Sequence, residues 1–193
     1  MKPRSGTITL ARHGEPALSR KVRLDAAGYA EFWARYEEGG ILEGQAPPAH
    51  LTEAADNADL IFTSSRRRAV ESARLVLGER AFEEDVCFIE APLPPPPLPA
   101  FIRMSPRIWG FFSRVSWWWF NHHAGQETKA QATLRARDAA KRISDAADQG
   151  KNVLVFAHGF FNAMLGLELI RLGWKRTWGR GYKYWSTRRF ERR

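Results

Sequence analysis

Short apolar runs, each followed by a helical pattern, recur along this chain and constrain its fold more than any other feature. Residues 7–10 (TITL) precede a helical pattern in residues 24–40, and residues 59–65 (DLIFTSS) precede one in residues 68–78. The run NVLVFA, which begins at residue 152, is followed in the same way by GFFNAML. Strands that alternate with helices are typical of a parallel sheet covered by helices. The sequence therefore predicts an α/β fold.

The remaining segments give further elements. We expect a third strand at residues 86–90 (VCFIE), with Glu83 and Glu84 in a solvated turn before it, and a final strand in residues 182–193. Ser105 before Pro106 predicts a helix start. Thr128 begins a capping-box pattern, and a long helix is expected after it with a stripe of small apolar residues, namely Ala132, Ala136, Ala139, Ile143 and Ala147.

Polar residues follow the first of these strands at once. Arg12 and His13 come directly after the strand pattern, and Gly14 is expected to let the backbone turn sharply there. Ligands of open α/β sheets bind at the carboxyl ends of the strands. The stretch LARHGEP is therefore a candidate site, although a solvated pair of polar residues would look the same.

Length and composition favour one ordered domain over residues 1–193. The chain is 44% hydrophobic and has eight tryptophans, whereas disordered chains lack such apolar surface. Cys87 is the only cysteine, which excludes an intramolecular disulfide, and the residues before Arg12 lack the apolar core of a secretory signal. We expect a cytoplasmic protein, whose oligomeric state the sequence does not reveal.

The charge points to anionic partners. Thirty Lys and Arg residues against 21 Asp and Glu residues give a net charge of +9, which suits phosphorylated metabolites, nucleic acid or lipid headgroups. The longest apolar run contains His158, Asn162 and Glu168, which a membrane-spanning helix rarely tolerates together. This run is better interpreted as a strand, a turn and a helix.

Four stretches in this order, LARHGEP, TSSRRRAVESA, GQET and VFAHGFFNA, resemble the histidine phosphatase superfamily, whose members are phosphoglycerate-mutase-like. The resemblance covers nearly the whole chain and is weak only between Glu90 and Ala124. It implies a three-layer α/β/α sandwich with a mostly parallel central sheet. It also implies that His13 is the nucleophile, that Arg12 and Arg68 bind phosphate, and that His158 completes the phosphate site.

The chemistry of phosphoryl transfer agrees with these roles. A neutral imidazole can attack phosphorus near pH 7 without a separate base, because its ordinary pKa is about 6.5. Guanidinium groups bind phosphate oxygens through paired, charge-assisted hydrogen bonds. Among the three consecutive arginines, Arg68 matches the family pattern because an alanine follows it, and Arg66 and Arg67 are expected to be solvated.

Two further site residues follow from the resemblance. Ser19 lies where many relatives carry an asparagine that helps to hold phosphate. Glu90 lies where the family supplies the carboxylate that protonates the leaving group, but the sequence PLPPPPLP replaces the usual continuation and could displace it. Glu15 is ambiguous, and Glu127 is expected to stabilise a helix start.

The divergent region at about 91–124 is expected to form a substrate lid. Its tryptophan run could instead pack in the core, stack on bases or bind a membrane surface. The prolines are expected to form a rigid wall beside the pocket, with an adaptor-domain ligand as the alternative. The adjacent His122 and His123 have no supporting carboxylate cluster, so we expect no metal site.

Together, these features predict a metal-independent phosphomonoester hydrolase that forms a phosphohistidine on His13, needs no cofactor and acts on a small phosphorylated metabolite. We expect no nucleic-acid partner, and membrane association is a minor alternative. A phosphoglycerate-mutase-type phosphoryl transferase is the nearest rival function. A catalytically weak anion-binding module is the other, although intact His13, Arg12, Arg68 and His158 argue against it.

Overall fold

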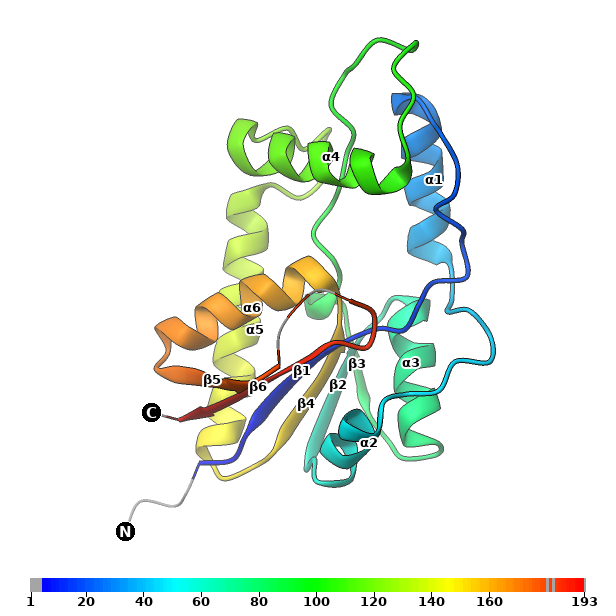
Figure 1. The fold of residues 1–193 in the computed structure, drawn as a ribbon. Coiled ribbons are helices and arrows are strands. Elements are labelled where there is room, and N and C mark those ends of the chain that lie inside the picture. The colour runs from blue at the N-terminus through cyan, green and yellow to red at the C-terminus, as the bar shows by residue number, and fades with distance from the viewer. Residues whose placement is uncertain (1–4, 180, 182, 193) are drawn as a thin grey trace.

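The computed structural model describes residues 5–179, 181 and 183–192, which form a central sheet with helices on both faces (Figure 1). The helices are α1 (Ala26–Glu38), α2 (Ala49–Asp56), α3 (Arg67–Leu77), the single 3-10 turn η1 (Val86–Phe88), α4 (Pro106–Phe120), α5 (Lys129–Asp148) and α6 (Gly159–Arg171). The strands are β1 (Ile8–Arg12), β2 (Leu60–Ser64), β3 (Glu83–Asp85), β4 (Val153–Ala157), β5 (Trp174–Trp178) and β6 (Thr187–Arg192).

The six strands lie in the order β3-β2-β4-β1-β6-β5. Neighbouring strands from β3 to β1 are parallel, whereas β6 runs antiparallel to both β1 and β5. The predicted α/β/α architecture with a mostly parallel sheet is confirmed. Since β1, β2 and β4 end at the same edge, the residues that follow them lie near one another.

Two layers of core hold the helices against the sheet. On one face, α5 and α6 cover Ile8, Leu10, Val153 and Val155, and the predicted small-residue stripe of α5 is buried there. On the other face, residues of α2 and α3 pack against Ala11, Ile61, Leu154 and Phe156. The small side chains of the α5 stripe let this helix approach the sheet closely. The Thr128 capping box at its start is also present.

A third cluster lies beyond the carboxyl edge of the sheet, between α1 and α4. Tyr29, Phe32 and Tyr36 of α1 are buried against Trp109 of α4. As Figure 1 shows, α4 lies across the end of the molecule above this edge. Ser105 precedes α4 and Pro106 is its first residue, as expected.

The expected third strand is misplaced. The strand consists of Glu83, Glu84 and Asp85, whereas residues 86–88 form η1. β3 lies at the sheet edge with exposed side chains, so it can be acidic, and Arg142 of α5 forms ion pairs with Glu83 and Asp85. The apolar Phe88, which suggested a strand, is instead buried from the 3-10 turn. Residues 182 and 193 of the expected final strand lie outside the described residues, and β6 begins at Thr187.

Candidate active site

All the predicted site residues except Ser19 meet at the carboxyl edge of the sheet. Arg12 ends β1 and His13 follows it, while Arg68 lies in the first turn of α3. Together with Glu90, these residues line a cavity of about 490 Å³. His158, which follows β4, lies beside His13 with 5.1 Å between the ring centroids.

His13 has one ring nitrogen held by the backbone. Its Nδ1 lies 2.7 Å from the carbonyl oxygen of Gly14. Because a carbonyl only accepts hydrogen bonds, Nδ1 is the nitrogen that carries the proton in the neutral ring. Nε2 therefore keeps its lone pair, which is the form that a nucleophile needs.

Both buried histidines favour the neutral state. Burial lowers the pKa of His13 well below 6.5, and the guanidinium groups of Arg68 and Arg12 lower it further, against a raising contribution from the bond to Gly14. Burial and Arg68 likewise lower the pKa of His158 well below 6.5. At pH 7 the unliganded site therefore holds two neutral imidazoles, and the positive charge around them belongs to arginines.

Arg68 is anchored by α1. Its Nη1 donates to the carbonyl oxygens of Tyr36 and Glu37, at 2.9 and 3.2 Å, and its Nη2 donates to Glu37 Oε1 at 2.8 Å. The remaining nitrogen, Nε, is buried and has no hydrogen-bond partner among the described residues, and the same holds for Nδ1 of His158. An anion beside His13 would offer acceptors to both atoms.

Arg12 lies against the segment before β6. Its guanidinium carbon is 4.5 Å from the centre of the Tyr184 ring, and its backbone N–H donates to the carbonyl oxygen of Ser186. On the other side it approaches Gly159, where a Cβ atom would stand 3.3 Å from the guanidinium carbon. The first turn of α6 and the turn before β6 thus hold this arginine from two sides.

The carboxylate of Glu90 lies at the N-terminus of α6. Its Oε1 accepts hydrogen bonds from the backbone N–H groups of Phe161 and Ala91, and its Oε2 accepts one from Phe160. The proline-rich segment that follows has therefore not carried Glu90 away from the cavity. Glu90 also occupies the position of a helix-capping anion, a role that sequence reasoning did not foresee.

Ser19 is not brought to the cavity. Its side chain is exposed, and its hydroxyl accepts a hydrogen bond from the backbone N–H of Lys21. The next residue, Arg20, lines the cavity instead and donates from Nη2 to the Tyr36 hydroxyl at 2.6 Å. The phosphate role of Ser19 stays a prediction. The adjacent positive charge was the signal that could have identified Arg20.

The outer wall of the cavity comes from α4 and the loop before it. Leu93, Arg107, Phe111 and Arg114 line it, so part of the divergent region does cover the site. Arg114 lies 3.7 Å from the centre of the Phe160 ring and donates to the carbonyls of residues 91 and 92, at 3.3 Å each. Burial lowers its pKa to about 10. The sequence alone did not single out Arg107 or Arg114 as site residues.

Several other candidates have structural partners. Arg66 pairs with Glu37 and Arg67 with Glu71. Glu127, expected at a helix start, pairs with Arg135 of α5.

The remaining candidates are not among the residues that line the cavity. Glu15 is exposed and donates its backbone N–H to Gln45, whereas His122 Nε2 lies 2.9 Å from the Pro95 carbonyl oxygen. Within the described residues, no group of three or more His, Cys, Asp or Glu residues is arranged to hold a metal ion. No helix in the same residues is long and apolar enough to cross a membrane.

Comparison with known families shows where this chain belongs. The family model for branch 1 of the histidine phosphatase superfamily matches residues 8–193. The chain belongs to this superfamily. The match spans every strand and helix described above. A search of curated protein sequences finds no match.

Solved structures confirm the fold of this superfamily member. Phosphoglycerate mutase from Bacillus anthracis superposes with a TM-score of 0.57 at 15% identity, covering 99% of this chain and 90% of the mutase. The mycobacterial glucosyl-3-phosphoglycerate phosphatase Rv2419c superposes with a TM-score of 0.52 at 20% identity, covering 87% of this chain and 81% of the phosphatase. Phosphoserine phosphatase from Entamoeba histolytica, in complex with 3-phosphoglyceric acid, superposes with a TM-score of 0.52 at 16% identity, covering 86% of this chain and 80% of that phosphatase. The neighbours thus include both phosphatases and a mutase.

Proposed function

We propose that this chain is a phosphomonoester hydrolase that carries the phosphoryl group on His13. One observation supports this above the others: the bond from Nδ1 to the Gly14 carbonyl leaves the Nε2 lone pair available in a neutral, buried imidazole surrounded by arginines. Such a ring can attack phosphorus at pH 7 without a separate base.

In the first step, Nε2 of His13 bonds to phosphorus as the ester P–O bond breaks. Arg12 and Arg68 stabilise the equatorial oxygens, and Nδ1 of His158 donates to one of them when the Ser64 hydroxyl donates to its Nε2, 2.8 Å away. Glu90, in its protonated form, gives its proton to the leaving alkoxide. In the second step, Glu90 takes a proton from water, which attacks phosphorus and releases phosphate and free His13.

The proposed substrate is a small phosphorylated metabolite. A volume of about 490 Å³ falls within the range of small-molecule sites. Beyond the phosphate end, aromatic side chains and Arg20, Arg107 and Arg114 line the cavity, and Glu90 is the one acidic residue among the lining residues described. This wall favours a substrate with an apolar or planar portion and a further negative charge.

The test is to trap the intermediate. The purified protein is mixed with a labelled phosphomonoester, quenched rapidly in alkali and analysed by mass spectrometry. We expect acid-labile label on His13, with no label and no turnover in His13→Gln. His50→Gln should keep both, because His50 lies on α2 and does not line the cavity. Label on another residue during active turnover would falsify the proposal.

Two further measurements separate the alternatives. Release of inorganic phosphate from an aryl phosphate distinguishes a hydrolase from a mutase, which would return the phosphoryl group to a second hydroxyl. Tight binding of phosphate without any turnover would indicate the anion-binding module. We also expect full activity in the presence of a chelator, since arginines supply the positive charge that a metal would otherwise supply. If the chelator-treated protein is active only after divalent metal is added back, the prediction of metal independence is wrong.

A further inference from the structure

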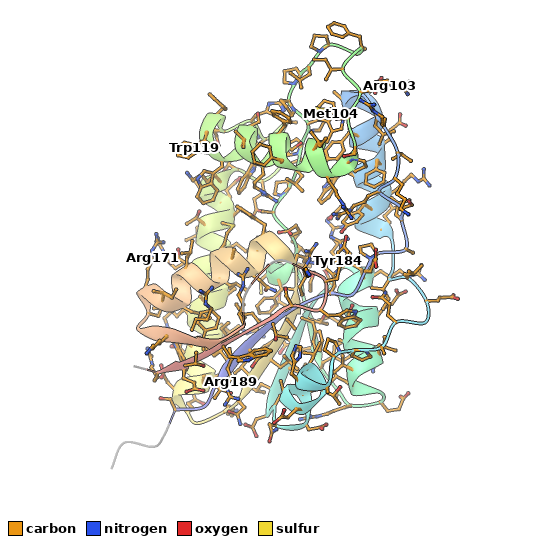
Figure 2. The ribbon with its side chains drawn as sticks, in the orientation of Figure 1. Arg103, Met104, Trp119, Arg171, Tyr184 and Arg189 are labelled. Carbon is orange, nitrogen blue, oxygen red and sulfur yellow. The ribbon has the colours of Figure 1, made fainter. Side chains whose placement is uncertain are left out.

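Helix α4 carries large apolar side chains on its solvent side. Ile108, Phe112 and Trp119 follow one another at spacings of four and seven residues, which places them on one face, and they are exposed, as are the flanking Phe111 and Phe120. We call these five residues the α4 stripe. Trp119 is 75% exposed and Phe120 is 78% exposed. Figure 2 shows Trp119 at the end of α4, at the outer edge of the molecule.

The opposite face of α4 already forms the contacts that hold the helix in place. Trp109, Ser113 and Trp117 are fully buried, and the indole N–H groups donate to the carbonyl oxygens of Leu24 and Glu127. The stripe is therefore not needed for packing within the chain. Large apolar side chains that gather on an exposed helix face commonly mark a partner surface, so the stripe indicates one.

The surroundings of the stripe are basic. Residues 91–126 contain no Asp or Glu, while Arg103 and Arg107 are exposed beside the start of α4. Backbone hydrogen bonds in both directions join Leu24 to Met104, which places the exposed Lys21 and Arg23 next to this end. Arg23 itself donates to the Arg103 carbonyl oxygen.

We propose that the α4 stripe docks on an anionic lipid bilayer surface. Phe and Trp side chains insert at the boundary between headgroups and acyl chains, and nearby Lys and Arg residues are attracted to anionic headgroups. A second copy of this chain fits less well as the partner, because the basic residues beside its α4 stripe would face the same basic residues of the first copy and repel them. The net charge of +9 acts in the same direction. This proposal does not depend on the chemistry of His13.

Docking of α4 would also place the part of the cavity wall that α4 forms at the membrane surface. Arg107 and Phe111 line the cavity from the same helix that carries the stripe. Trp119 and Phe120 do not line it, so they can be changed without altering the site.

The experiment measures cosedimentation of the full-length protein with vesicles of phosphatidylcholine alone or with phosphatidylglycerol, at low and moderate salt. We expect binding to the anionic vesicles that weakens as salt rises. Trp119→Ser/Phe120→Ser should bind about tenfold more weakly, because two interfacial aromatic side chains are lost. Hydrolysis of a water-soluble aryl phosphate, or thermal unfolding if no activity is found, checks that this variant folds.

The matched control is Val86→Ser/Trp178→Ser, which removes two exposed apolar side chains from η1 and β5. It should bind the vesicles like the unmodified protein. Equal weakening in both variants, or no binding to anionic vesicles at low salt, overturns the proposal. So does a dimer in sedimentation velocity that dissociates only in the α4 variant, because a second copy would then cover the stripe.

Discussion

The imidazole of His13 is buried beside Arg68 and Arg12, and both the burial and these positive charges oppose its protonation. The Gly14 carbonyl oxygen determines which ring nitrogen carries the proton of the neutral form. Each of these effects comes from a different element: β1, α3 and the turn at Gly14. A single residue thus depends on three segments for its reactive form. Glu90 likewise depends on a segment far from it in the sequence, since its oxygens accept hydrogen bonds from the first turn of α6.

Replacement of Glu90 by glutamine tests its proposed role as proton donor. We expect an alkyl phosphate to be hydrolysed about 10²–10⁴-fold more slowly, because glutamine has no transferable proton. An aryl phosphate, whose leaving group needs less help, should lose much less activity. The measurement compares the two substrates in pre-steady-state kinetics, where phosphorylation of His13 is observed directly.

The control for this variant is thermal unfolding. A glutamine NH₂ group cannot accept the hydrogen bonds that Glu90 accepts from α6, so a loss of about 0.5–2 kcal/mol of unfolding free energy is expected, as for a lost helix cap. If both substrates lose the same small factor while phosphorylation limits each, Glu90 is a capping residue and the donor lies elsewhere.

At this scale the sequence was a good guide where a residue follows a strand directly. Arg12, His13 and His158 are placed by β1 and β4, and Arg68 by the start of α3, so their neighbourhood follows from the topology. Ser19 and Arg20 lie in an irregular segment, where a shift of one residue decides which side chain faces the cavity. No periodic pattern reports such a shift.

At the scale of elements, the end of β1 packs against the segment that leads into β6. Gly14 does not have a positive φ, so the conformational freedom expected of it is not what the fold uses. It is needed for space: an added Cβ would stand 2.5 Å from Cζ2 of Trp185. Trp185 in turn donates from Nε1 to Gln45 and from its backbone N–H to the His13 carbonyl oxygen.

Gly14→Ala should therefore displace Trp185. We expect a loss of about 1–3 kcal/mol of unfolding free energy, typical of overpacking, together with reduced turnover because the neighbouring Tyr184 contacts Arg12 and His13. Denaturant unfolding measures the first effect. Adding Trp185→Leu should recover part of the stability in a double-mutant cycle, since it removes the clash.

Gly110→Ala is the matched control, because its added Cβ would meet only the Tyr29 hydroxyl at an ordinary 3.6 Å. In a helix this change should be neutral or stabilising by about 0.5–1 kcal/mol. Equal destabilisation by both substitutions would show that the Trp185 contact does not explain the effect.

Elements with a buried face were predictable, and exposed ones were not. The alanine stripe of α5 and the apolar runs of β1, β2 and β4 have the periodicity that burial imposes. The edge strands β3 and β5 have mostly exposed side chains, so hydrophobic patterning gave no sign of either. The short α2 follows two prolines and also escaped notice. That residues 91–124 serve as a substrate lid stays a prediction.

For the molecule as a whole, the two buried histidines make stability depend on pH. Their pKa values are lowered in the folded state, so between those values and about 6.5 only the unfolded chain binds the protons. The unfolding free energy should have its full value above pH 6.5. As the pH drops under 6.5, it should decrease by up to about 1.4 kcal/mol per pH unit for each histidine. Thermal unfolding between pH 7.5 and pH 5.5 measures the slope.

The double variant His13→Gln/His158→Gln should show a smaller slope of unfolding free energy against pH, whether or not the variant is less stable overall. An unchanged slope would assign the effect to other groups. Phosphate binding should oppose the acid destabilisation, because an anion beside the imidazoles favours their protonated forms and stabilises only the folded chain.

The position of β1 has a consequence for the order in which the protein can acquire its activity. β1 lies between β4 and β6, so the strand that presents His13 receives both of its hydrogen-bonded neighbours from segments translated much later. While the ribosome is still elongating the chain, His13 has emerged but has neither a sheet nor His158 and Tyr184 beside it. Such distant pairings also form slowly during folding. The chemistry proposed for His13 therefore requires that β6 has left the ribosome, and we expect no action of the nascent chain on phosphoesters before then.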